Sequence, residues 1–219
     1  GKITHFLQHG LRTDTEKECG IYGRSGRKTT GLWHLCHVQP GGLREQTMIQ
    51  LYCGDGKGKT TAAVGAAIRA AGRGRLVLFA QFMKGQESGE LMILRGLQQI
   101  RVLHSDRTFP FYREMTEGQK KELRLFHDRM LQEVQTALLR KEADFVILDE
   151  ITHASRLHMA DEKLLQRVLE LGKGTEREIL LTGREPTLQM WEVSDYISEI
   201  RNVRHPYAGG ITARTGVER

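Results

Sequence analysis

Cysteine is scarce in this 219-residue chain, and it lacks apolar runs long enough to cross a membrane. The three cysteines form an odd number without a C-x-x-C pair, so we expect no disulfide framework and a cytoplasmic location. No charged-then-apolar signal peptide opens the chain, and no internal repeat recurs along it. The sequence therefore predicts neither a disulfide-stapled secreted domain nor a membrane protein.

The chain also lacks a long segment in which charges of one sign are concentrated. The formal net charge is +6, but acidic residues lie between the basic ones throughout the chain. We identify no basic, aromatic-lined channel of the kind that a nucleic-acid motor uses. A protein that binds polyphosphate also needs a positive bias, so the charge alone does not choose a ligand. No nucleic-acid or membrane partner is predicted.

The most informative stretch is residues 48–65, which read MIQLYCGDGKGKTTAAVG. An apolar-rich run of strand type is followed by glycines that alternate with Asp55 and Lys57, and then by an alanine-rich segment typical of a helix. Strand, glycine loop and helix is the order that a phosphate-binding loop requires. The match to G-x-x-x-x-G-K-[ST] departs at one place, because Cys53 stands at the first glycine position and Gly54 comes one place late.

Each residue type in this loop suits a triphosphate. Glycines let backbone N–H groups turn toward phosphate oxygens, Lys59 supplies a full positive charge, and the Thr60 hydroxyl is a ligand for Mg²⁺. The alternative is a glycine-rich turn with an ordinary surface lysine, which the strand and helix context disfavours. The predicted nucleotide-binding residues of the loop are Gly54, Asp55, Gly56, Lys57, Gly58, Lys59, Thr60 and Thr61.

A second informative stretch is residues 144–150, DFVILDE, an apolar strand that ends in two carboxylates. A phosphate-loop enzyme needs such carboxylates opposite its loop to hold Mg²⁺ or its water shell. Asp149 and Glu150 are therefore predicted as metal residues together with Thr60. The alternative is a pair of surface carboxylates at the end of a strand.

Strands and helices alternate along the chain. The pattern predicts strands at 48–52, 75–82, 100–104, 144–150, 178–182 and 196–204, and helices at 59–73, 90–98, 116–142, 161–171 and 186–193. This favours the α/β class, with a P-loop NTPase-like (RecA-like), mostly parallel sheet and helices on both faces. Open sheets of this kind bind ligands at the carboxyl ends of their strands, where Lys84 and Arg184 are expected. Arg184 either contacts an anion or caps a helix.

A loop at 105–115 carries Phe109, Pro110, Phe111 and Tyr112. These aromatics either pin the loop to the core or form a wall for a large flat ligand, and the two interpretations are equally supported. His127, beside the apolar stripe of the long helix, is interpreted as structural rather than catalytic.

The chain is expected to divide into an N-terminal extension, residues 1–47, and one phosphate-loop domain, residues 48–219. The extension lacks any sustained period and is either a flexible arm over the site or sequence added ahead of a natural start at Met48.

The residues taken alone support binding of Mg-ATP or a similar nucleotide, but they do not define the reaction. A small-molecule kinase or NTPase remains open, with Glu150 as base and Arg184 near the γ-phosphate. A nucleic-acid ATPase is the least favoured class.

Five blocks resemble the ATP:corrinoid adenosyltransferases of cobalamin biosynthesis. They read CGDGKGKTTAA at 53–63, QFMKG at 81–85, VILDE at 146–150, LTGR at 181–184 and the closing region at 205–216. The resemblance covers roughly residues 48–219 and accounts for the shifted glycine at Cys53. It implies that Co(I) of a reduced corrinoid attacks the 5′-carbon of ATP and that triphosphate leaves.

The resemblance also implies roles for residues. Lys59 and Glu150 would be catalytic, with Mg²⁺ or Mn²⁺ assisting, and Lys84 and Arg184 would line the nucleotide site. Phe109 and Phe111 fall in the loop that places aromatics beside the corrin ring. Pro110 and Tyr112 differ from the family pattern there, in which a Trp is typical at the second aromatic position. A flavin-type reductant or reductase and a homodimer are the implied partners. The charged N-terminal helix of the family is not recognisable in residues 1–47.

Overall fold

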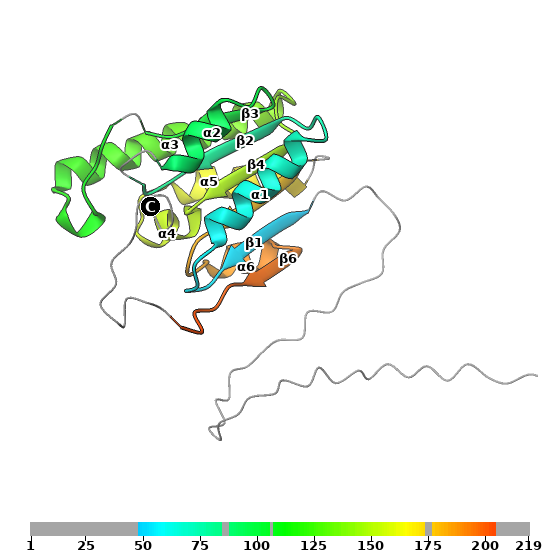
Figure 1. Ribbon diagram of the computed structural model, residues 1–219. Helices are drawn as coiled ribbons and strands as arrows, with labels where there is room; N and C mark the ends of the chain where they lie inside the picture. The colour runs from blue at the N-terminus through cyan, green and yellow to red at the C-terminus, as the bar shows by residue number, and fades with distance from the viewer. Residues whose placement is uncertain (1–47, 85–87, 106, 174–176, 205–219) are drawn as a thin grey trace, which may run out of the picture. The chain divides into compact units, whose positions relative to one another are not determined.

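A parallel sheet forms the centre of the protein (Figure 1). The computed structural model describes residues 48–84, 88–105, 107–173 and 177–204. Within them, the strands are all parallel and pair in the order β3-β2-β4-β5-β1-β6. The strands are β1 (Ile49–Cys53), β2 (Val77–Gln81), β3 (Ile100–Leu103), β4 (Phe145–Asp149), β5 (Glu178–Thr182) and β6 (Tyr196–Glu199). The predicted α/β class and mostly parallel sheet are confirmed.

Helices cover both faces of this sheet, as expected (Figure 1). One face packs against α1 and α2, and the other packs against α3, α4, α5 and α6. The helices are α1 (Lys59–Ala71), α2 (Gly89–Arg95), α3 (Glu117–Leu139), α4 (Ile151–Arg156), α5 (Glu162–Lys173) and α6 (Leu188–Val193), with a short 3₁₀ helix η1 (Tyr112–Glu114).

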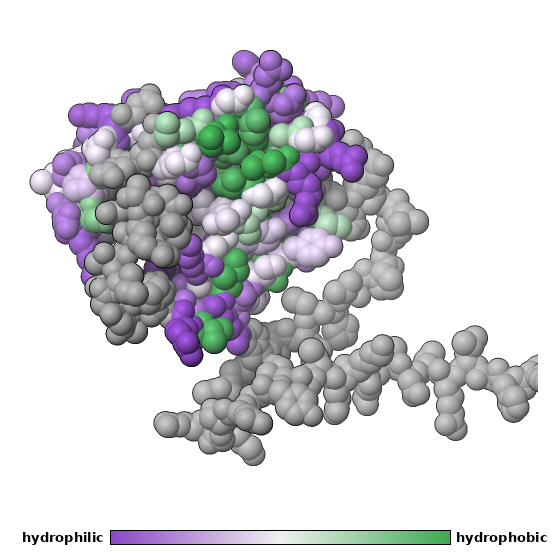
Figure 2. All heavy atoms as spheres, viewed as in Figure 1, coloured by the Kyte–Doolittle hydropathy of each residue, from purple (hydrophilic) through white to green (hydrophobic). Residues whose placement is uncertain are grey.

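The central strands are buried on both sides, which explains their continuous apolar sequence. In β2, Val77 and Phe79 face the α1 and α2 side, whereas Leu78 and Ala80 face the α3 side. Helix α1 turns its small alanines, Ala63 and Ala67 among them, toward the sheet, so its backbone packs close to the strands. The outer surface of α1 and α2 keeps exposed apolar side chains, visible as a green area in Figure 2.

Helix ends follow the sequence signals in one case and depart from them in another. The capping box of α3 is confirmed, since the Thr116 hydroxyl accepts from the Gln119 backbone N–H and the Gln119 side chain accepts from Thr116 N. Helix α6 was predicted to start with Pro186, and this is wrong. It starts at Leu188, because Thr187 is the N-cap and its hydroxyl accepts from the Met190 backbone N–H.

Two local features were not predicted. Helix α4 begins directly after β4, because Glu150 adopts a left-handed conformation that turns the chain at once. The last strand was predicted to reach residue 204, but β6 ends at Glu199. Ile200 N still donates to the carbonyl of Cys53 at the end of β1, and the Ile200 carbonyl accepts from Gly56 N in the loop that follows β1.

Parts of the predictions lie outside the described residues. These are the extension at residues 1–47 and the closing region at 205–216, so the division into extension and domain stays a prediction. None of the helices in the described residues is long and apolar enough to cross a membrane.

Candidate functional site

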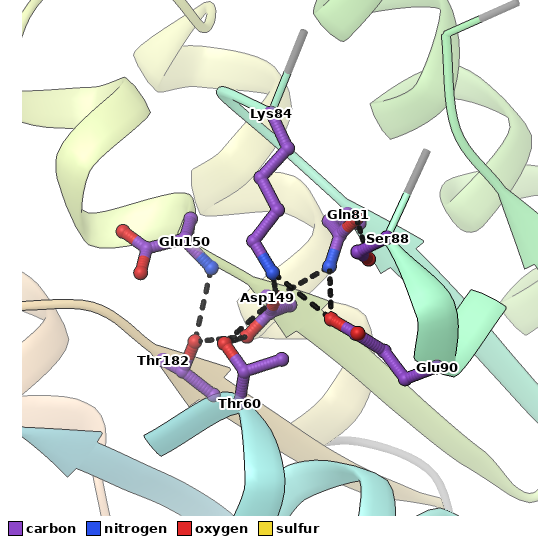
Figure 3. Close-up of polar contacts among 8 residues, drawn as sticks. All are labelled: Thr60, Gln81, Lys84, Ser88, Glu90, Asp149, Glu150 and Thr182. Atoms are coloured by element: carbon purple, nitrogen blue, oxygen red, sulfur yellow. Dashed lines mark hydrogen bonds and ion pairs between the residues drawn. The ribbon is translucent and has the colours of Figure 1, made fainter. Parts of the chain in front are cut away.

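The loops after β1, β2, β4 and β5 meet at one edge of the sheet, because parallel strands all end on the same side. Figure 3 shows side chains from the ends of β2 and β5, from the start of α1, from Lys84 after β2 and from the start of α2 lying around Asp149 at the end of β4. This edge holds the polar residues that the sequence singled out.

The glycine loop owes its shape to two left-handed residues. Gly54 has φ 100° and Gly58 has φ 116°, a region that side-chain-bearing residues rarely adopt. Cys53, by contrast, is the last residue of β1 and is buried in the core. The glycine is therefore required one place after the expected position, which explains the departure from the motif.

Lys59 folds back into this loop. Its side-chain ammonium donates to the carbonyl oxygens of Gly54 at 2.8 Å and Gly56 at 2.7 Å, and the residue is 7% exposed. Burial lowers the pKa of Lys59, and the nearby Arg184 guanidinium lowers it further against the opposing effect of Glu150. A cation held by neutral carbonyls is well suited to receive an anion.

Asp149 is fully buried, and three neighbours donate hydrogen bonds to its carboxylate (Figure 3). The Thr60 hydroxyl donates to Oδ1 at 2.9 Å, the Thr182 hydroxyl donates to Oδ1 at 2.7 Å, and Gln81 Nε2 donates to Oδ2 at 3.0 Å. A buried charge needs such donors, since without them the carboxylate would be strongly destabilised. Through Thr60, the first turn of α1 is thus hydrogen-bonded directly to Asp149 at the end of β4.

Lys84 and Glu90 extend this network. Lys84 Nζ lies 3.0 Å from Glu90 Oε1 and 3.9 Å from Asp149 Oδ2. Gln81 Oε1 accepts from the Ser88 hydroxyl at 3.2 Å, which fixes the orientation of the Gln81 amide. Burial acts to raise the pKa of Glu90, but hydrogen bonds from its own backbone and Ser88, together with the Lys84 charge, leave it lowered.

Glu150 lies beside Asp149 but points away from it (Figure 3). Its backbone N–H donates to the Thr182 hydroxyl at 2.9 Å, so Thr182 bridges the two acidic residues. Burial, followed by the neighbouring Asp149 charge, raises the pKa of Glu150. The side chain is close enough to Lys59 for their charges to interact.

The remaining loop residues differ in exposure. Gly56 is buried, whereas Asp55, Lys57 and Thr61 are exposed. Asp55 Oδ1 accepts from the Asn202 backbone N–H at 3.1 Å. The structure therefore brings the predicted loop residues to one place, with the Asp55 carboxylate directed to the chain after β6.

Arg184 is exposed at the end of β5, and its backbone carbonyl accepts from Gly54 N at 3.0 Å. Its positive charge is near enough to Lys59 to lower the pKa of that side chain. The alternative role as a helix cap is not supported, since Thr187 caps α6. Two positive charges beside the loop are the arrangement that a polyanion requires.

The two interpretations of the aromatic loop divide between its residues. Phe109 is 6% exposed and belongs to the core, so it pins the loop. Phe111 is 80% exposed and precedes η1. Tyr112 packs partly against the core, with Lys120 Nζ 5.0 Å from its ring centre. Only Phe111 of the two predicted phenylalanines presents an open apolar side chain.

His127 has the contacts of a structural residue. It is 2% exposed, Nδ1 lies 2.8 Å from the Met159 carbonyl, and Nε2 accepts from the Met83 backbone N–H at 3.2 Å. Burial lowers its pKa to about 4. Its bonds hold Met83, which has φ 60°, just ahead of Lys84. The structural interpretation agrees with these contacts.

Four contributors were missed from the sequence: Gln81, Ser88, Glu90 and Thr182. A lone amide that ends an apolar strand was the available signal for Gln81. Glu90 reads as an ordinary acidic residue in the first turn of a helix, and Thr182 as a good strand former. Their roles emerge only when β2, β4 and β5 are placed side by side.

The donor set fits a hard cation. Oxygen atoms of Thr60 and Asp149 lie together, and Glu150, whose carboxylate is directed away from Asp149, is the next residue in the chain (Figure 3). In the part of the chain that the structure describes, no group of three or more His, Cys, Asp or Glu gathers as a metal cage. Mg²⁺ commonly binds through only one or two protein ligands and completes its shell with phosphates and water.

Comparison with known proteins decides the family. Residues 45–219 match the family described as ATP:corrinoid adenosyltransferase BtuR/CobO/CobP. The chain belongs to this family. Among corrinoid adenosyltransferases, the protein of Escherichia coli K12 is 31% identical over 178 residues, covering 80% of this chain and 86% of the relative.

Two further relatives are similar at the same level. The corrinoid adenosyltransferase CobA of Salmonella typhimurium LT2 is 31% identical, with 80% of this chain and 86% of the relative covered. The corrinoid adenosyltransferase of Pseudomonas aeruginosa is 30% identical, with 80% and 84% covered. The expected resemblance to the adenosyltransferases is confirmed, and it does not favour the kinase or NTPase alternative.

Proposed function

We propose that this adenosyltransferase-family chain transfers the 5′-deoxyadenosyl group of ATP to the Co(I) centre of a reduced corrinoid and releases triphosphate. One observation carries the proposal. Lys59, folded into the glycine loop, lies at the same sheet edge as the hydrogen-bonded pair of Thr60 and Asp149. Family membership then selects the adenosyl transfer over the phosphoryl transfer that such a loop usually serves.

The chemistry balances without a proton transfer. The electron pair of Co(I) forms the Co–C bond to the 5′-carbon, the C–O bond at that carbon breaks, and triphosphate departs with the bonding pair. Negative charge therefore develops on the leaving group. The chain's task is to neutralise that charge, which preorganised N–H groups and cations do efficiently in a partly dry site. No general base is required, so Glu150 acts electrostatically in this proposal.

The residues divide this task. Backbone N–H groups of the loop and the ammonium of Lys59 would hold the triphosphate, with Arg184 and Lys84 adding positive charge at its edge. Thr60, Asp149 and Glu150 would hold Mg²⁺, or Mn²⁺ in its place. Such an ion, when bound, neutralises part of the phosphate charge.

The aromatic loop would supply the corrinoid side of the site. Phe111 is 80% exposed and offers an apolar surface to a flat ring, while buried Phe109 keeps the loop in place. An apolar wall there would exclude water and the lower axial ligand, and so favour the four-coordinate cobalt that is reduced more easily.

Finer points rest on the family resemblance. We propose a flavin-type reductant or a reductase as the source of the electron that makes Co(I), a homodimer as the assembly and the cytoplasm as the location. Light scattering on the purified full chain tests the assembly, with twice the monomer mass of 24.9 kDa as the expected result.

Isotope transfer tests the reaction itself. ATP labelled on the 5′-carbon is expected to pass its label to the corrinoid under anaerobic reducing conditions, whereas a γ-phosphate label stays in intact triphosphate. Label in inorganic phosphate or in another small molecule, with none in the corrinoid, would instead indicate a kinase or NTPase.

A further inference from the structure

The chain directly after β6 lies on the glycine loop. We name residues 200–202 the strap. Ile200 N donates to the carbonyl of Cys53 at 2.8 Å, and the Ile200 carbonyl accepts from Gly56 N at 2.8 Å. Asn202 N donates to Asp55 Oδ1 at 3.1 Å. Three hydrogen bonds therefore connect the strap to the last residue of β1 and to the loop that follows it.

The contact is close enough to dictate glycine. A Cβ atom added at Gly54 would lie 2.4 Å from the Ile200 carbonyl oxygen. One added at Gly56 would lie 2.7 Å from the same oxygen and 2.8 Å from the backbone of Arg201. Both distances are too short for real Cβ contacts with backbone. The close approach of the strap therefore requires glycine at both positions, whether or not a phosphate also approaches them.

Protein carbonyls also occupy two backbone N–H groups of the loop. Gly56 N is bonded to Ile200, and Gly54 N is bonded to the Arg184 carbonyl at 3.0 Å. The amides at these two positions are therefore directed to the protein and not to a ligand. The loop is held in shape from two sides, by the chain after β5 and by the strap after β6.

Asp55 is the one side chain of the loop that bonds to the strap. A carboxylate next to a triphosphate repels it, so a direct nucleotide contact by the Asp55 side chain would cost affinity. Accepting the Asn202 N–H gives the side chain a different task, and Asp and Asn side chains commonly accept from nearby backbone in this way.

We propose that the Asp55 side chain is a positioning residue that fastens the strap to the loop and so preorganises the loop for the triphosphate. The proposal rests on the proposed function, because it takes ATP as the ligand of the loop. The loop backbone at residue 55 keeps its predicted place in nucleotide binding. The new roles are those of the Asp55 carboxylate, which accepts from Asn202 N, and of the strap, which holds the loop in shape.

Two variants separate the acceptor from the charge. Asp55→Asn and Asp55→Ala both remove the negative charge, but only Asp55→Asn keeps an oxygen that accepts from Asn202 N. Calorimetric titration of each full-length protein with Mg-ATP, without corrinoid, is expected to give affinity about two- to tenfold weaker for D55A than for D55N, the range of one ordinary hydrogen bond. An intact-mass check guards D55N against deamidation.

Hydrogen exchange gives a readout that does not depend on ATP. Peptides covering the strap in the ligand-free protein are expected to exchange faster in D55A than in D55N and the unaltered chain. Equal exchange in D55A and D55N would overturn the fastening role. Faster exchange in D55A with equal ATP affinity would overturn the preorganising role. If the unaltered chain binds no Mg-ATP, the proposed function fails, while the exchange data still decide whether Asp55 holds the strap.

Discussion

Thr182 offers the sharpest test of how the acidic end of β4 is held together. Its hydroxyl donates to Asp149 Oδ1 at 2.7 Å and accepts from Glu150 N at 2.9 Å, and both Thr182 and Asp149 are 0% exposed. Thr182→Val has nearly the same shape but removes both hydrogen bonds. The buried carboxylate loses one donor, and the Glu150 N–H loses its acceptor.

The expected cost follows from these two losses. A hydrogen bond to a charged group contributes about 1.5–3 kcal/mol, and a buried donor left without a partner costs about 1–3 kcal/mol. We therefore expect T182V to lower the free energy of unfolding by about 3–5 kcal/mol. Thr182→Ser keeps the hydroxyl and loses only a methyl group, so it is expected to cost about 1 kcal/mol.

Urea unfolding of the two variants and the unaltered chain measures both values by linear extrapolation. The comparison is made at equal protein concentration and without nucleotide, so that ligand binding does not contribute. T182V and T182S within about 1 kcal/mol of each other would refute the assignment of Thr182 as the bridge between the two acidic residues.

Three further outcomes are expected. Lys59→Ala should abolish turnover, while Lys163→Ala, an exposed lysine on α5, should not; near-normal turnover in K59A would contradict the loop assignment. Phe111→Ala should impair the reduction-dependent step more than ATP affinity, and equal loss of both would count against its role. His127 should make stability fall with acid. Its pKa is about 4 in the folded protein and about 6.5 unfolded, so only the unfolded chain gains this proton between those values. Up to about 3 kcal/mol of unfolding free energy is therefore lost as pH falls from about 6.5 to about 4. Unfolding titrations of His127→Gln should show a shallower pH dependence over this range, and an unchanged slope would contradict the assignment.

The parts of the site that are continuous in sequence were predictable. The glycine loop, Lys59 and Thr60 lie within one strand–loop–helix unit, and their residue types carry the chemistry by themselves. Asp149 and Glu150 could also be singled out as candidates, because an apolar strand that ends in two carboxylates is a local pattern. The sheet class followed for the same reason, since alternating strands and helices leave few arrangements.

The parts that depend on strand order were not predictable. Gln81 reaches Asp149 only because β2 pairs with β4, and Thr182 reaches it only because β5 lies on the other side. Nothing in a single sequence states that order. Glu90 and Lys84 meet across the start of α2, where an acidic residue has an ordinary explanation in the helix dipole.

The strap was missed for a related reason. Residues 200–204 were predicted as a continuation of the last strand, but β6 ends at Glu199. The competing interaction is the set of hydrogen bonds that Ile200 and Asn202 make with the end of β1 and with the loop after it. Such backbone contacts over long sequence distance leave no residue-type signature, apart from the glycines that make room for them.

One measurement tests the central claim most directly. The full-length protein is mixed anaerobically with Mg-ATP and a chemically reduced Co(I) corrinoid, while the cobalt spectrum and the phosphate product are followed together. The account predicts a light-sensitive cobalt–carbon product and stoichiometric intact triphosphate. Release of diphosphate or monophosphate with no change in the cobalt spectrum would contradict it, and would return the chain's loop to ordinary phosphoryl transfer.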